Sequence, residues 1–171
     1  MKILWILPFL PYPVDMGGKF WSYYHLKKLS ENHDITIISF YDSDYYNQEF
    51  IKEISNFCLD IKLIPYPSKH KPKGITKIKS RLTKFFKIFV FRTPLFVQGM
   101  YTDSKMAREI ELMCKVHDYD IVQIFPSRMA WYVQSLPPKV VKILVILDIE
   151  HERNYRFVSL LKNPLKKSKR Y

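Results

Sequence analysis

Runs of consecutive apolar residues alternate with amphipathic stretches along the chain, and this pattern predicts an α/β domain. The apolar runs predict buried strands at residues 2–7, 35–40, 59–64, 119–125 and 140–147. Near-continuous apolar strands are typical of a parallel sheet that helices cover on both faces. The sequence therefore predicts such a sheet within one domain spanning residues 1–171.

Apolar residues that recur at helical spacing predict the helices between these strands. They fall at residues 19–32, 49–57, 104–116 and 153–161, with a shorter helix that begins at a capping Ser127 and runs through Val133. In the first helix we expect the sheet-facing residues to be Phe20, Tyr23, Tyr24, Leu26 and Leu29. Lys27 and Lys28 of the same helix are expected to point to solvent.

A proline-rich turn and two glycines connect the first strand to the first helix. Gly17 and Gly18 would permit a positive φ and let a ligand approach the main chain closely. The N–H groups and dipole at the start of the helix would favour an anion such as a phosphate. An ordinary tight turn explains the same glycines, and Asp15 either caps the helix or contacts the ligand. The loop has neither the GxGxxG nor the Walker spacing.

The net charge is +12, which indicates an anionic partner, and its distribution is uneven. No acidic residue lies between Asp60 and Asp103, where the segment Ile75 to Phe91 combines apolar residues at helical spacing with basic neighbours. Such a segment is typical either of an interfacial helix on anionic lipid or of a helix packed on the sheet with a basic rim. The candidate membrane contacts are Lys77, Arg81, Lys84, Phe85, Lys87 and Phe89. No nucleic-acid recognition motif is present, and we expect no nucleic-acid partner.

Cys58 and Cys114 lie in apolar or amphipathic segments, so we expect reduced thiols and a cytoplasmic protein. No Cys or His spacing indicates a metal site. Asp42 and Asp44 have the DxD spacing but follow a strand in a polar loop, and we expect neither a metal nor a cofactor. The first apolar run is a poor signal peptide, and no segment reaches the roughly 20 apolar residues that span a bilayer.

Three segments resemble the N-terminal domain of GT-B glycosyltransferases of family 4. The first, ILPFLPYPVDMGGKFWSYYHLKKLSENHDITIISF, is similar to the family's first strand, PxPxxxGG stretch and helix. The second, HDYDIVQIFPSRMAWYV, is similar to a strand with the helix after it, and the third, ILDIEHERNYRF, to a strand end of the form LDxEHNxExxR. The likeness spans nearly the whole chain and is weakest over residues 66–95. It implies a Rossmann-like domain, the N-terminal half of a GT-B fold.

The resemblance also implies an activity for the complete enzyme. A sugar would pass from a nucleotide diphosphate sugar to a glycan or lipid-linked acceptor in cell-envelope polysaccharide synthesis, with retention of configuration and without a metal. Gly17 and Gly18 would face the cleft between two domains, near the donor diphosphate and the acceptor. Asp148, Glu150 and His151 match the loop after the last strand, which faces the same cleft.

His151 is the candidate catalytic residue. It follows the carboxyl end of a strand, and a neutral imidazole there would hydrogen-bond a sugar hydroxyl or assist proton transfer. A loop histidine bonded to Asp148 or Glu150 is the structural alternative. The match is imperfect, because Glu152 stands where the family has Asn. Arg128, near the start of the short helix, faces either the cleft or the outer surface.

In the resembled enzymes a second domain binds the sugar nucleotide, commonly through an ExxxxxxxE motif. We expect that domain to be absent from residues 1–171, either because the chain is a fragment or because its partner is a separate polypeptide. The isolated chain should then have little or no transferase activity. The alternative is a non-catalytic module that docks on a membrane or completes a transferase in trans. The expected location is cytoplasmic, with peripheral attachment to the inner face of the cell membrane.

Overall fold

The fold is built on one parallel sheet. The computed structural model describes residues 1–42, 47–66 and 101–147. Five strands pair in the order β3-β2-β1-β4-β5, and every pairing is parallel. The strands are β1 (Lys2–Leu7), β2 (Asp34–Tyr41), β3 (Asp60–Pro65), β4 (Ile121–Ile124) and β5 (Val141–Leu144). The predicted fold class, an α/β Rossmann-like sheet, is confirmed.

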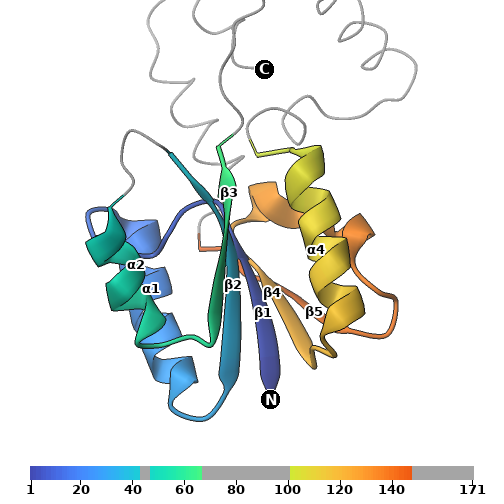
Figure 1. Ribbon diagram of the computed structural model, residues 1–171, viewed down its shortest axis with the longest axis horizontal. Coiled ribbons are helices and arrows are strands. Elements are labelled where there is room, and N and C mark those ends of the chain that lie inside the picture. The colour runs from blue at the N-terminus through green and yellow to red at the C-terminus, as the bar shows by residue number, and fades with distance from the viewer. Residues whose placement is uncertain (43–46, 67–100, 148–171) are drawn as a thin grey trace, which may run out of the picture.

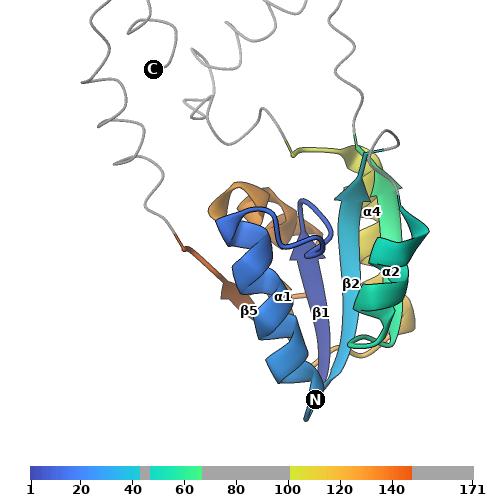
Figure 2. The same ribbon diagram turned by 90° about the vertical axis from the view of Figure 1, so that its left-hand side faces the viewer.

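Helices cover both faces of this sheet (Figure 1). The helices are α1 (Gly17–Ser30), α2 (Gln48–Ser55), α4 (Ser104–Val116) and the 3₁₀ helix η2 (Ser127–Ser135). Helices α1 and α2 lie on one face, while α4 and η2 lie on the other (Figures 1 and 2). Two separate apolar clusters result, one on each face. The described helices between β1 and β3 therefore lie on one face, and those between β3 and β5 lie on the opposite face.

The central strand shows why the apolar runs are continuous. Residues 3–7 of β1 are at most 3% exposed. Leu4 and Ile6 enter the cluster beneath α4 and η2, while Trp5 and Leu7 enter the cluster beneath α1 and α2. A strand buried on both faces has no solvent-facing position, so its sequence does not alternate between apolar and polar residues.

Local hydrogen bonds fix two of the helix starts. The Asn47 side chain accepts a hydrogen bond from the N–H of Glu49 at the start of α2. The Asp103 carboxylate accepts from the N–H groups of Lys105 and Met106 at the start of α4. The prediction that Ser127 caps the short helix is wrong, because Pro126 holds the cap position and no side chain caps η2.

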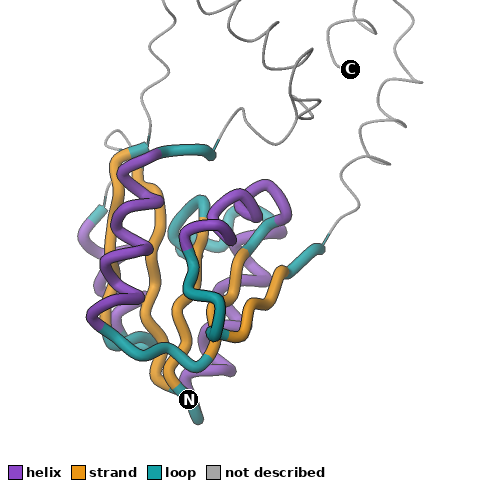
Figure 3. Tube along the Cα trace, turned by 90° about the vertical axis from the view of Figure 1, so that its right-hand side faces the viewer, coloured by secondary structure: helices purple, strands orange, loops and turns teal. Residues whose placement is uncertain are grey.

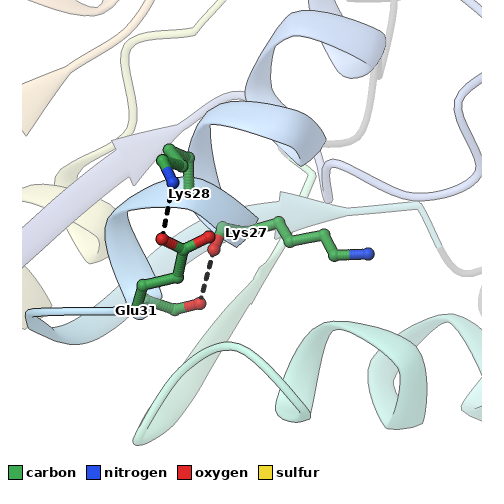
Figure 4. A network of polar contacts seen from close by, with 4 residues as sticks. Lys27, Lys28 and Glu31 are labelled. Carbon is green, nitrogen blue, oxygen red and sulfur yellow. Dashed lines mark hydrogen bonds and ion pairs between the residues drawn. The ribbon is translucent and has the colours of Figure 1, made fainter.

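Helix α1 corrects one sequence prediction. Phe20 and Tyr24, expected to face the sheet, are 55% and 51% exposed, and their rings contact each other at 4.6 Å between centroids. Leu26 is buried as expected, Tyr23 and Leu29 pack against the same cluster, and Ser22 is buried in addition. At the far end of the helix, the Lys28 ammonium pairs with the Glu31 carboxylate at 2.6 Å (Figure 4). The sheet-facing stripe is therefore narrower than the aromatic content suggested.

Candidate functional site

A pocket opens at the carboxyl ends of the strands. Its volume is about 370 Å³. The lining residues follow β1, β4 and β5, begin α1 or, in the case of Tyr101, precede α4: Pro8, Phe9, Met16, Gly17, Gly18, Tyr101, Phe125, Pro126, Ser127, Arg128, Ile146 and Leu147. The chain leaves β1 toward β2 on one side, whereas β4 leads to β5 on the other. The pocket thus lies at the topological switch point, where open α/β sheets bind their ligands.

The N-terminus of α1 reaches this pocket without a cap. Met16 holds the cap position in an extended conformation, with φ −148° and ψ 153°, and no side chain caps the helix. The first turn contains no acidic residue, and the N–H of Phe20 makes the first bond of the helix, to the Met16 carbonyl at 2.9 Å. The preceding N–H groups and the positive end of the helix dipole therefore remain available to an anion.

Asp15 does not cap α1, so that sequence prediction is wrong. Its carboxylate pairs with the Lys19 ammonium one turn into the helix, at 2.9 Å, and its side chain is 57% exposed. Asp15 is also not among the residues that line the pocket. The Lys19 ammonium therefore compensates the negative charge of a carboxylate that lies beside the start of the helix.

The two glycines have different surroundings. A Cβ on Gly18 would lie 3.3 Å from Phe9 Cζ and 3.5 Å from Phe125 Cζ, whereas a Cβ on Gly17 would meet nothing within 4 Å. Neither glycine has a φ in the left-handed region, so the chain does not use the positive φ that these residues would permit. Gly18 permits close packing of the two aromatic rings, and Gly17 leaves open space at the pocket.

Aromatic rings form the floor of the pocket. Phe9 and Phe125 meet edge to face at 6.2 Å, and Trp21 lies 5.4 Å from Phe125 behind them. Sequence reasoning missed Phe9, Phe125 and Tyr101 as pocket residues. Apolar residues directly after a strand could have indicated pocket residues such as Phe9 and Phe125. Such residues are equally common in the hydrophobic core, so the pattern does not distinguish a pocket from a core. Only the tertiary contacts distinguish the two roles.

A polar cluster lies on the α1 side of the sheet, behind this floor. His25 stacks on Trp21 at 4.4 Å and meets Trp5 edge to face at 5.4 Å. Burial lowers the pKa of His25, and a hydrogen bond with Gln123 opposes that shift. Trp5 Nε1, Ser22 Oγ and Gln123 Nε2 are buried without a hydrogen-bond partner. The imidazole is therefore favoured in its neutral form within a mostly apolar interface.

The pocket contains few polar side chains. Ser127 and Arg128, at the start of η2, line it together with the start of α1. Arg128 is thus placed on the pocket side, one of the two positions that its sequence left open. An arginine beside free helix N–H groups suits a phosphate or diphosphate, because the guanidinium donates in a planar fork.

The remaining predicted site residues and the two cysteines differ in what the structure says of them. Asp148, Glu150, His151 and the six candidate membrane contacts lie outside the described residues. Cys58 and Cys114 are free thiols, and burial raises the pKa of Cys58 to about 12 and that of Cys114 in the same direction. Both thiols are therefore protonated and poor nucleophiles near neutral pH.

The described part of the chain has neither a metal site nor a helix that could span a membrane. Residues 1–42, 47–66 and 101–147 contain no cluster of three or more His, Cys, Asp or Glu side chains arranged for a metal ion. Within those same ranges, no helix combines the length and apolar character that crossing a bilayer requires.

The charge of the chain is segregated. The described residues contain twelve Lys and Arg and twelve Asp and Glu, so their formal charge is zero. The whole net charge of +12 therefore belongs to residues 43–46, 67–100 and 148–171. The net charge that would attract the chain to an anionic surface therefore belongs to those segments.

The fold and the pocket define a class: an open α/β domain with a ligand pocket at its switch point. No family model and no curated protein matches the sequence. The chain is similar to the crystal structure of the C-terminal domain of a hydrogenase from Pyrococcus furiosus, with 13% identity, 85% of this chain and 91% of that chain covered, and a TM-score of 0.47. A likeness at this level carries no argument about function.

Proposed function

We propose that the chain is the acceptor-side domain of a family 4-like GT-B glycosyltransferase. The complete enzyme would transfer a sugar, with retention and without a metal, from a nucleotide diphosphate sugar to a glycan or lipid-linked acceptor in cell-envelope polysaccharide synthesis. The observation that carries the proposal is the pocket at the switch point, into which the uncapped N-terminus of α1 opens. The sequence resemblance supplies the reaction.

The pocket lining supports two kinds of contact. The start of α1 and Arg128 offer N–H donors to a diphosphate. Phe9, Phe125 and Met16 offer an apolar wall, against which a sugar ring or a lipid chain would pack. In the complete enzyme, the nucleotide-sugar domain would form the opposite wall and hold most of the donor.

We further propose that Asp148, Glu150 and His151 belong to the same cleft. Leu147 lines the pocket, and Asp148 is the next residue of the chain. His151 would contact a sugar hydroxyl or move a proton as the candidate catalytic residue, while the two carboxylates would position it or bind hydroxyl groups.

A ligand titration tests the pocket. We would titrate the full chain with inorganic pyrophosphate and with UDP-glucose and follow the backbone amides by NMR. We expect millimolar or undetectable binding of UDP-glucose, and pyrophosphate shifts confined to Gly17, Gly18, Ser127 and Arg128. Arg128→Gln should weaken pyrophosphate binding several-fold, and Val116→Lys, on the exposed end of α4, should leave it unchanged. Tight UDP-glucose binding, or shifts elsewhere, would contradict the proposed division between two domains.

A second observation tests the enzyme assignment directly. The proposal predicts that the native reading frame continues beyond Tyr171 or that a partner gene encodes the second domain. A continuation or partner that contains an acidic nucleotide-sugar segment supports the proposal, and one that lacks such a segment overturns it.

The charge segregation favours a second candidate, a membrane-docking or partner-binding module without its own catalysis. All of the excess positive charge lies in segments outside the neutral sheet and helices. A basic excess of this size suits attachment to an anionic membrane. Vesicle binding without any pyrophosphate binding would favour this candidate over the enzyme.

A further inference from the structure

A buried tyrosine hydroxyl joins two segments that line the pocket. Tyr132 of η2 is fully buried, in the apolar cluster beneath α4 and η2. Its hydroxyl accepts a hydrogen bond from the N–H of Asp103 at 3.0 Å and donates one to the carbonyl of Tyr101. These two residues lead into α4, which lies beside η2 on this face of the sheet (Figure 3). The hydroxyl therefore ties η2 to the chain that enters α4.

Each of the two segments contributes to the lining of the pocket. Tyr101 lines it from the entry to α4, and Ser127 and Arg128 line it from the start of η2. Tyr132 lies in the same helix as Arg128, and its side chain does not line the pocket itself. Its two hydrogen bonds therefore set where the Arg128 segment lies relative to the Tyr101 segment.

The Tyr132 hydroxyl can donate and accept at the same time only while it is protonated. Burial raises the pKa of this phenol, so it stays protonated near neutral pH. Both of its partners are main-chain groups, so its bonds hold the backbone of Tyr101 and Asp103 in place. The ring meets Trp131 edge to face at 5.4 Å, and its burial leaves it little freedom to rotate. Tyr132 is therefore a rigid connection between η2 and the entry to α4.

Binding of an anion requires that Arg128 be held at a fixed place. We propose that Tyr132 positions Arg128 for the anion in the pocket, by holding the start of η2 against the entry to α4. This inference rests on the proposed function, because it assumes that Arg128 contacts a diphosphate. A binding group must be held within about 0.5 Å of its place, and packed side chains with fixed hydrogen bonds supply that constraint. Without the hydroxyl, one N–H and one C=O lose their partner, and η2 can shift against α4.

A double-mutant cycle tests the proposal. The full chain and its Tyr132→Phe, Arg128→Gln and doubly substituted variants are titrated with inorganic pyrophosphate, and the backbone amides are followed by NMR. We expect Tyr132→Phe to raise the pyrophosphate dissociation constant about fivefold in the wild-type chain and to have no further effect once Arg128 is replaced. A merely structural loss would weaken binding equally in both backgrounds and would contradict the proposal.

Tyr119→Phe is the matched control. The Tyr119 hydroxyl also bonds within the protein, to Thr36, and its ring packs on the same apolar cluster. Tyr119 precedes β4, at the end of the strands opposite to the pocket. Tyr119→Phe should therefore cost stability but leave pyrophosphate binding unchanged. Circular dichroism establishes that every variant is folded at the temperature of the titration.

A measurement on the wild-type chain adds a test that needs no substitution. Pyrophosphate bound at Arg128 should slow hydrogen exchange of the Asp103 amide, because coupling between two sites is reciprocal. Unchanged exchange at saturating pyrophosphate would overturn the proposal, as would an equal loss of affinity in Tyr119→Phe. A wild-type chain that binds no pyrophosphate would refute the proposed anion site and this role with it. Wild-type binding that Tyr132→Phe does not weaken would refute the role of Tyr132 alone.

Discussion

At the scale of single residues, Gly17 and Gly18 are neighbours in the sequence but have different surroundings in the structure. Gly18 leaves room for the rings of Phe9 and Phe125, whereas Gly17 borders only open space. A sequence pattern treats the pair as one feature. The structure separates a packing glycine from one that a ligand could approach.

We predict that Gly17→Ala and Gly18→Ala have different effects on the free energy of unfolding. Gly17→Ala should leave stability unchanged or raise it by up to about 1 kcal/mol, because alanine is the better helix former. Gly18→Ala should lower the free energy of unfolding by about 1 kcal/mol, because its Cβ crowds the ring of Phe9. Urea unfolding measures both. The double variant Gly18→Ala/Phe9→Leu should recover part of the loss, and equal effects of the two single variants would refute the distinction.

His25 gives the chain a pH dependence of known sign. Burial lowers its pKa in the folded state below the value of the unfolded chain. The unfolded state then binds more protons between those two values, so stability rises with pH there and falls as the pH drops below about 6.5. We predict that His25→Gln shows a smaller loss of unfolding free energy between pH 7.5 and about 5.5.

Urea unfolding at both pH values checks this prediction. His117→Gln is the control, since His117 is an exposed residue at the end of α4. Wild-type and His25→Gln chains with the same pH dependence would show that His25 does not contribute to the acid sensitivity.

At the scale of elements, α1 lacks the side-chain N-cap that α2 and α4 have. Asn47 and Asp103 cap those two helices, while the start of α1 at Met16 has no side-chain cap. A missing cap leaves N–H groups without partners and costs helix stability. The same groups point to the pocket, so the local cost coincides with the place where an anion would bind.

We predict a trade between stability and binding at this position. Met16→Asp should supply a cap and raise the free energy of unfolding by about 1 kcal/mol. The new carboxylate should also weaken pyrophosphate binding several-fold, because it occupies the free N–H groups and adds like charge. Met16→Ala, which cannot cap, should change neither quantity strongly. Urea unfolding and NMR titration measure the two effects, and stabilisation without weaker binding would separate the helix start from the pocket.

At the scale of the whole molecule, a neutral sheet with its helices is joined to strongly basic segments. We predict that full-length chain binds vesicles containing phosphatidylglycerol, and that Lys77→Glu/Arg81→Glu/Lys84→Glu weakens binding by at least about 100-fold. The estimate follows from roughly 1 kcal/mol per basic residue near an anionic surface. Co-sedimentation measures it. A Lys27→Glu/Lys28→Glu variant on α1 is the control, and equal losses in the two variants would refute a specific contact by residues 75–91.

The sequence also predicted most of the sheet, but the ends of elements shifted. Helix α1 was expected at residues 19–32 and spans Gly17–Ser30, and the last strand was expected at 140–147 and spans Val141–Leu144. Runs of apolar residues indicate which part of the chain is buried. Because burial can continue past the last hydrogen bond of a strand, the ends of an apolar run do not give the ends of the strand. Phe20 and Tyr24 show the converse, because aromatic residues at helical spacing can face solvent.

By itself, the sequence determined the alternation of strands and helices, the parallel sheet and the segregation of charge, since these depend on composition and period along the chain. Tertiary structure alone decided that Phe9, Gly18 and Phe125 meet in one pocket, that Asp15 turns to Lys19 instead of capping α1, and that β5 is the last of the described strands at one side of the sheet. Each of these depends on segments distant in the chain or on the choice between equivalent partners. Local pattern contains no information about either.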